Sequence, residues 1–172
     1  MGNTLEALKQ RRSIRKYKPE QIKAAELDAV LEAGTWAASG MGAQSAVMVV
    51  VQDKETIGKI EKLNAQVLSK PDARPFYGAP TVVTVFVDKK AVTPLQDGSL
   101  VMGNLLTAAS AVGLGSCWIA RAREAFESAE GKALRKEWGL SDDYDAVAHC
   151  ILGYADETPA PKPRKSGYII RK

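Results

Sequence analysis

Two short runs of β-branched apolar residues constrain the fold most strongly, AVMVVVQ at 46–52 and TVVTVFV at 81–87. Both are too short to be buried helices, and neither alternates with polar residues as a half-exposed strand does. Each run therefore predicts a strand that is covered on both faces, and we expect 46–52 to be a central strand. A sheet covered on both faces needs helices on each side of it.

The remaining pattern supplies those helices and two more strands. Asn3 and Glu6 resemble a capping box for a short helix over 3–10. Apolar residues at helical spacing predict further helices from Pro19 to near Gly34, over 57–67, over 96–112 and within 126–138, where Ser128 could cap the second part. Short strands are expected at 116–120 and 146–154. This order of elements fits either an α+β or an α/β sheet with helices packed against it.

Length and composition predict one domain over 1–172, with a C-terminal arm over about 155–172. The two cysteines and the single histidine lack metal-ligand spacing, so we expect no metal site and no disulfide scaffold. There is no apolar stretch of membrane-spanning length, and MGNTLEALKQRR lacks the apolar core of a signal peptide. These features predict a soluble, reduced, cytoplasmic protein without a membrane partner.

The expected helix over 96–112 is apolar or small on nearly every face. So much apolar helix is difficult to bury in so small a domain unless another subunit covers part of it. The pattern favours a homodimer, although a helix enclosed by its own domain is the alternative.

The charge is divided unevenly along the chain. Residues 1–18 hold six cations and one acid, residues 159–172 hold five cations and no acid, and the overall net charge is +4. Basic ends of this kind could meet nucleic acid, an acidic membrane surface or the phosphate of a small ligand, or they could be solvated tails. The lack of clustered stacking aromatics argues against nucleic acid.

No sequence motif of side-chain catalysis is present, neither a nucleophile elbow, nor a P-loop, nor a zinc-protease helix. A bound cofactor could supply the reactivity instead. The string Arg11-Arg12-Ser13-Ile14-Arg15 suits the anchor of such a cofactor, because guanidinium forks and a hydroxyl match phosphate oxygens.

Several separated blocks of the sequence resemble the flavin-dependent nitroreductase family, in its small single-domain subgroup, and appear in that family's order. They are RRSIRKY at 11–17, ASGMGAQ at 38–44, FYGAPTVVTVFVD at 76–88, D-G-x-L-x-x-x-N-L-L-x-A-A at 97–109, GLGSCWI at 113–119 and ILGYADETPAPKPRK at 151–165. The resemblance implies an α+β sandwich-like fold, with a mostly antiparallel central sheet flanked by helices. It also implies an intertwined homodimer with an extended C-terminal arm and with an FMN in each of two sites at the subunit interface.

The activity implied by the resemblance is that of an FMN-dependent oxidoreductase with NAD(P)H as co-substrate. Hydride passes from NAD(P)H to flavin N5, the oxidised NAD(P)⁺ leaves, and a small nitroaromatic, quinone or similar acceptor is then reduced in the same cleft, which is a ping-pong mechanism. The alternatives are a flavin-binding or flavin-processing member without this turnover and, less favoured, a nucleic-acid-binding protein with basic ends.

The resemblance also assigns residues to the FMN site, none of them a catalytic acid, base or nucleophile. The phosphate and ribityl chain would be held by Arg11, Arg12 and Ser13 together with Lys162 and Arg164. Arg15 would lie near flavin N1, where a cation stabilises negative charge. The partner subunit would place a loop over the ring edge through Ser39, Gly40, Met41, Gly42 and Gln44. The segment that passes the N5 side would be Trp118, Ile119 and Ala120.

Two positions depart from the family's pattern. Ala38 stands where the family usually has proline, and Gly42 where it usually has asparagine. Loss of that asparagine puts the choice of substrate in question. Elsewhere, we expect His149 and Cys117 to be packed in the core, and Asn104 to find a hydrogen-bond partner in the cofactor loop, in a helix or in water.

Overall fold

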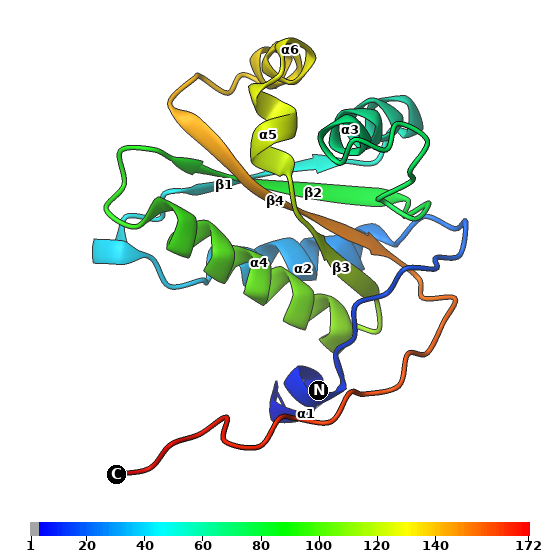
Figure 1. Ribbon diagram of the computed structural model, residues 1–172, viewed down its shortest axis with the longest axis vertical. Coiled ribbons are helices and arrows are strands. Elements are labelled where there is room, and N and C mark those ends of the chain that lie inside the picture. Colours follow the sequence, from blue (N-terminus) through cyan, green and yellow to red (C-terminus); the bar gives the residue numbers. More distant parts are fainter. Residues whose placement is uncertain (1–3) are drawn as a thin grey trace.

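Four strands form one antiparallel sheet in the computed structural model, which describes residues 4–172 (Figure 1). They are β1 (Ala46–Val51), β2 (Thr81–Asp88), β3 (Gly115–Ile119) and β4 (Tyr144–Gly153), in the order β1-β2-β4-β3. All neighbouring strands are antiparallel, which confirms the α+β fold over the α/β alternative.

The expectation that 46–52 forms a central strand is wrong, because β1 lies at an edge of the sheet. A continuous apolar run indicates that both faces of a strand are packed, and it says nothing about whether both of its edges are paired. Most of β1 is only half-buried, whereas β2 is buried along almost its whole length.

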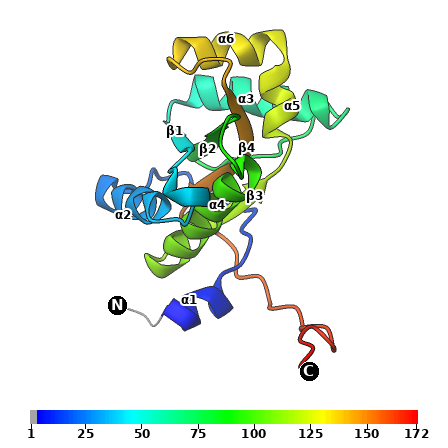
Figure 2. The ribbon, with the colours of Figure 1, turned by 90° about the vertical axis from the view of Figure 1, so that its left-hand side faces the viewer.

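Helices cover both faces of the sheet, as Figure 2 shows edge-on. One layer holds α2 (Ala24–Thr35) and α4 (Pro94–Ala111). The opposite layer holds α3 (Lys54–Val67), α5 (Ala122–Glu127) and α6 (Ala129–Glu137). The sheet thus separates two hydrophobic cores.

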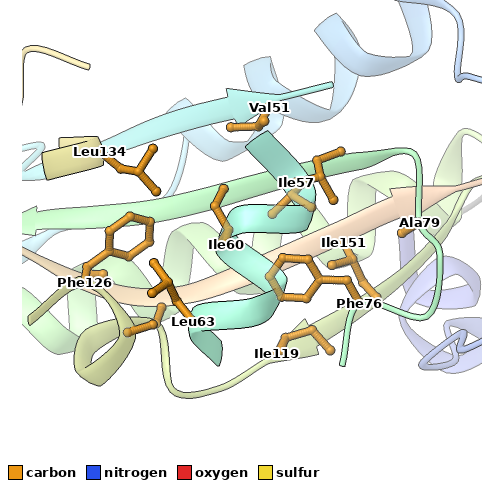
Figure 3. Packing of buried hydrophobic residues seen from close by; sticks show 14 of the residues in the cluster. Val51, Ile57, Ile60, Leu63, Phe76, Ala79, Ile119, Phe126, Leu134 and Ile151 are labelled. Carbon is orange, nitrogen blue, oxygen red and sulfur yellow. The ribbon is translucent and has the colours of Figure 1, made fainter. Parts of the chain in front are cut away.

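The core beneath α3, α5 and α6 is built around aromatic side chains (Figure 3). Phe126 meets Phe86 edge to face, with ring centroids 5.1 Å apart, and Ile60 and Phe76 are also fully buried. Edge-to-face aromatic pairs add to the stabilisation from buried area, by about 0.5–1.5 kcal/mol each. Cys117 and Ile119 of β3 belong to the same core, so its packing helps to position that strand.

Side-chain hydrogen bonds explain where α6 and α2 begin. Ser128 caps α6 by accepting the Gly131 N–H at 3.0 Å, as the sequence indicates. Helix α2 begins at Ala24 and not directly after Pro19, because the Gln21 side chain binds the backbone carbonyl of Pro80 at 3.0 Å and holds this segment against the start of β2. The expected capping box of the first helix involves Asn3, which lies outside the described residues.

The two ends of the chain meet beside β3. After α1 (Thr4–Gln10), the Ile14 N–H donates to the Ser116 carbonyl at 2.9 Å. The chain then pairs with the segment beyond β4, where Lys18 donates to the Tyr154 carbonyl and Asp156 donates to the Lys16 carbonyl, each at 2.9 Å. Residues 157–172 form no helix or strand, and Figure 1 shows them running past α1.

Across residues 4–172, none of the helices has both the length and the apolar character needed to cross a bilayer.

Candidate functional site

An open groove of about 740 Å³ lies where the two basic ends of the chain meet. The groove is lined by six of the residues expected to bind a cofactor: Arg11, Arg12, Ser13, Arg15, Lys162 and Arg164. Its other lining residues are Leu8, Lys9, Pro159, Ala160 and Pro161. The structure therefore brings together the two clusters of cations that the sequence keeps far apart.

Backbone hydrogen bonds fix the N-terminal wall of the groove. A parallel bridge joins Ser13 to Ser116 at the start of β3. Two residues later the Arg15 N–H donates to the carboxylate of Glu157, which ties this wall to the C-terminal segment. The positions of the cations thus depend on the sheet and on contacts between the two chain ends.

The residues that line the groove give it a positive charge. No acidic residue lines it, and among residues 4–172 none of the five predicted cations takes part in an ion pair. Arg12 donates from Nη1 to the carbonyls of Lys9 and Arg11, both at 2.7 Å, while its buried Nε has no hydrogen-bond partner in the described chain. Clustered guanidinium donors with unused N–H groups suit a group with several anionic oxygens, such as a phosphate.

The predicted segment 118–120 comprises the last two residues of β3 and the residue after it, close to the Ser13 bridge, but none of its residues lines the groove. Ile119 is buried in the core, whereas Trp118 and Ala120 are exposed. A buried amide fixes the end of this segment, because Asn64 Nδ2 donates to the Ala120 carbonyl at 2.7 Å. Asn64 Oδ1 also accepts from Arg121 Nε at 3.2 Å, and Arg121 has a left-handed backbone with φ of 71°.

The residues of the predicted ring-edge loop do not line the basic groove; they are Ser39, Gly40, Met41, Gly42 and Gln44. They surround the 3₁₀ turn η1 (Gly40–Gly42), near the N-terminal end of α4, whereas α1 and β3 lie toward its C-terminal end (Figure 1). Helix α4 is about 27 Å long at 1.5 Å per residue. Ser39 and Gln44 line a separate cavity of about 160 Å³. Within one chain, this loop and the basic groove are therefore two distinct places.

The backbone of this loop explains the glycine at position 42. Gly42 has φ of 67°, and a Cβ added to it would meet nothing within 4 Å. Glycine and asparagine are the residues that adopt this left-handed conformation most readily. The glycine thus keeps the loop conformation that an asparagine would allow, and it removes the side-chain amide.

Three other side chains that the sequence singles out, His149, Asn104 and Cys117, lie away from the groove lining. His149 lies in β4, fully buried, with Nδ1 2.8 Å from Thr84 Oγ1, which confirms that it is packed. Asn104 donates to the Ala33 carbonyl in α2 at 2.8 Å. Cys117 is a core residue, and burial raises the pKa of its thiol. Among residues 4–172, no cluster of His, Cys, Asp and Glu side chains is arranged to hold a metal ion.

Two features of the site escaped the sequence interpretation. Glu157, whose carboxylate accepts the Arg15 N–H, was assigned no role from the sequence. Asp97, an acid within the apolar run at 96–112, was also assigned no role, yet it is buried and accepts a hydrogen bond from the Gly40 N–H. Hydrogen bonds from Ser45, Gly40 and Thr93 hold the pKa of the Asp97 carboxyl below its usual value. An acid within an otherwise apolar helical run was the available signal.

Comparisons with known proteins agree with this geometry. The profile of the nitroreductase family matches residues 8–154. A nitroreductase with bound FMN from Bacteroides fragilis has the same fold with a TM-score of 0.91, 27% identity and full coverage of both chains. A nitroreductase with bound FMN from Desulfitobacterium hafniense gives 0.88, again with 27% identity and full coverage. An NADPH-flavin oxidoreductase from Vibrio harveyi is 24% identical over 99% of this chain and 73% of its own length. The chain belongs to the nitroreductase family.

Proposed function

We propose that this protein is an FMN-dependent oxidoreductase that uses NAD(P)H to reduce a nitroaromatic, a quinone or a similar small acceptor. One observation carries the proposal, namely that cations from both ends of the chain line a single groove with no acid among them. The FMN bound by the structures of B. fragilis and D. hafniense supports this choice of cofactor.

The groove residues would hold the cofactor by its phosphate. Arg11, Arg12 and the Ser13 hydroxyl would contact phosphate oxygens from one side, and Lys162 and Arg164 from the other. Arg15 would place a positive charge near the N1 edge of the ring, where negative charge develops on reduction. When bound, FMN supplies a redox centre that carries two electrons from NAD(P)H to the acceptor.

The rest of the site would position the flavin ring and the two substrates. Residues 118–120 would pass the N5 side of the ring, where a backbone N–H can contact it. NAD(P)H and the acceptor would occupy one cleft in turn, the first leaving before the second enters. No side chain of the chain itself needs to act as an acid, a base or a nucleophile in this scheme.

The proposal includes a homodimer, because the loop containing Met41 and the basic groove are separate within one chain. A second subunit could bring its loop to the ring edge of the first. Helix α4 leaves Leu95 and Leu100 exposed, and exposed apolar residues on a long helix suit coverage by another subunit.

The phosphate contacts can be tested by comparing FMN with riboflavin, which lacks the phosphate. The double variant Arg11→Ala/Arg164→Ala should weaken FMN binding about 10- to 100-fold, as expected for two partly exposed charge-assisted contacts. Riboflavin binding should not change. Lys59→Ala/Arg123→Ala, which removes two cations from the opposite layer of helices, is the matched control. Flavin fluorescence quenching measures all of these affinities.

Equal loss of riboflavin and FMN affinity would contradict the phosphate contacts, and a protein that takes up no FMN would refute the proposal. If FMN binds but added NADH or NADPH does not bleach its absorbance, the chain is a flavin-binding member without this turnover.

A further inference from the structure

Asp97, in the first turn of α4, connects the two ends of the loop formed by residues 40–45. Its Oδ1 accepts the Gly40 N–H at 2.9 Å and the Thr93 hydroxyl at 2.8 Å. Its Oδ2 accepts the Ser45 hydroxyl at 2.7 Å. The side chain is only 2% exposed, so one buried carboxylate receives three donors and closes the loop like a clamp.

The clamped loop has an uncommon backbone. Met41 and Gln44 have φ of 55° and 48°, in the left-handed region that residues other than glycine avoid. Such conformations persist only where the surrounding structure determines them. Met41 is 92% exposed, so packing of its own side chain does not hold it there.

Glycine at position 40 allows the loop to approach α4. A Cβ added to Gly40 would lie 2.1 Å from Thr93 Oγ1, which is closer than any real Cβ contact. The close approach lets the Gly40 N–H reach Asp97, so the clamp and the glycine depend on each other.

We propose that Asp97 is a positioning residue that holds the 40–45 loop in the strained shape in which Met41 and Gln44 stay exposed, available to the cofactor ring bound by a second subunit. The proposal rests on the proposed function for the identity of that ring. Asp97 does not touch the cofactor, and it acts through the loop.

The clamp itself is tested by amide hydrogen exchange on the full chain without added FMN. In Asp97→Ala, the Gly40 amide should exchange about 10- to 100-fold faster, the range that a charge-assisted hydrogen bond supports. Asp97→Asn should restore most of the protection, because its oxygen can accept from Gly40 and Thr93 while its NH₂ donates to the Ser45 hydroxyl. Ser99→Ala, in the same helix, removes a hydroxyl that donates to the Leu95 carbonyl and is not hydrogen-bonded to Asp97, so it should leave the Gly40 exchange unchanged.

The positioning role is tested with FMN bound. Asp97→Ala should alter the visible circular dichroism of the bound flavin and raise KM for a quinone about tenfold, with kcat nearly unchanged. Asp97→Asn should restore both. A purely structural residue would lower the unfolding temperature and leave the spectrum and KM of the folded enzyme as they are.

Unchanged Gly40 exchange in Asp97→Ala would overturn the clamp, and faster exchange with an unaltered spectrum and KM would overturn the positioning role. If Asp97→Ala does not fold, Ser45→Ala removes only the Oδ2 contact and serves the same measurements, with an expected increase of about threefold in the exchange of the loop amides. A wild-type chain that binds no FMN would refute the proposed function and with it the positioning role, whereas the exchange result on the clamp would still stand.

Discussion

The single histidine of the chain should make the stability of the protein fall as the pH is lowered from 7.5 to 5. His149 is fully buried, and its ring lies against Phe76 with centroids 5.0 Å apart. Its Nε2 has no hydrogen-bond partner among residues 4–172. Burial, aided by the charge of Arg121, lowers the pKa of His149 from 6.5 to about 3.

The direction of this pH dependence follows from which state of the chain, folded or unfolded, binds the proton at a given pH. Below pH 6.5 the unfolded chain protonates this side chain, whereas the folded chain does not until about pH 3. The stabilisation is therefore fully present above pH 6.5 and is lost as the pH falls. At pH 5 the loss is about 2 kcal/mol, from 1.36 kcal/mol for each of about 1.5 pH units. This value hardly depends on the folded pKa, provided that it lies well below 5.

The test compares the wild type with His149→Gln, whose side chain can keep a hydrogen bond to the Thr84 hydroxyl and does not titrate. Urea unfolding at pH 7.5 and 5.0, at one protein concentration, gives the two free energies of unfolding. The drop in the wild type should exceed the drop in the variant by about 2 kcal/mol. Since the sequence has no other histidine, equal drops in the two proteins would refute the reasoning.

Two glycine substitutions test the backbone. Gly42→Asn should leave the unfolding temperature nearly unchanged and shift the relative kcat/KM of nitroaromatic and quinone acceptors, whereas Gly42→Ala should cost about 1 kcal/mol because alanine tolerates the left-handed conformation poorly. Gly131→Ala should cost about 3 kcal/mol or more, because its Cβ would lie 2.2 Å from the Ala125 carbonyl oxygen. The control Gly139→Ala, with φ of 74° and open space, should cost about 1 kcal/mol in the same urea titration. Equal costs at positions 131 and 139 would contradict the steric argument.

Patterns that depend on neighbouring residues were predictable. Ser128 could be identified as a helix cap because a cap acts within one helical turn. The strand at 81–87 could be identified because its own continuous run of apolar residues indicates burial. The edge position of β1 could not be predicted, because strand order depends on pairing between distant segments.

The candidate site likewise has residues that the sequence predicts and residues that it does not. The uneven charge showed that both chain ends are basic, and the family resemblance predicted that Arg11 and Lys162 belong to one site; both residues line the same groove. The role of Asp97 was hidden, because its three donors come from residues 40, 45 and 93, which no local pattern connects. A buried acid can be recognised in a sequence, but its partners require the fold.

The pairing of the two chain ends also affects how the protein is made. Arg15 and the Glu157 that receives its N–H are 142 positions apart, and Lys162 and Arg164 follow later still. During synthesis, the residues of the first wall are therefore translated long before those of the second wall. The groove cannot close until nearly all of the domain has been translated, and contacts of such high sequence separation form late and slowly. If the groove anchors FMN as proposed, capture of the cofactor through both walls would have to wait for this stage, and a chain that stops before residue 162 would carry only the N-terminal cations of the anchor.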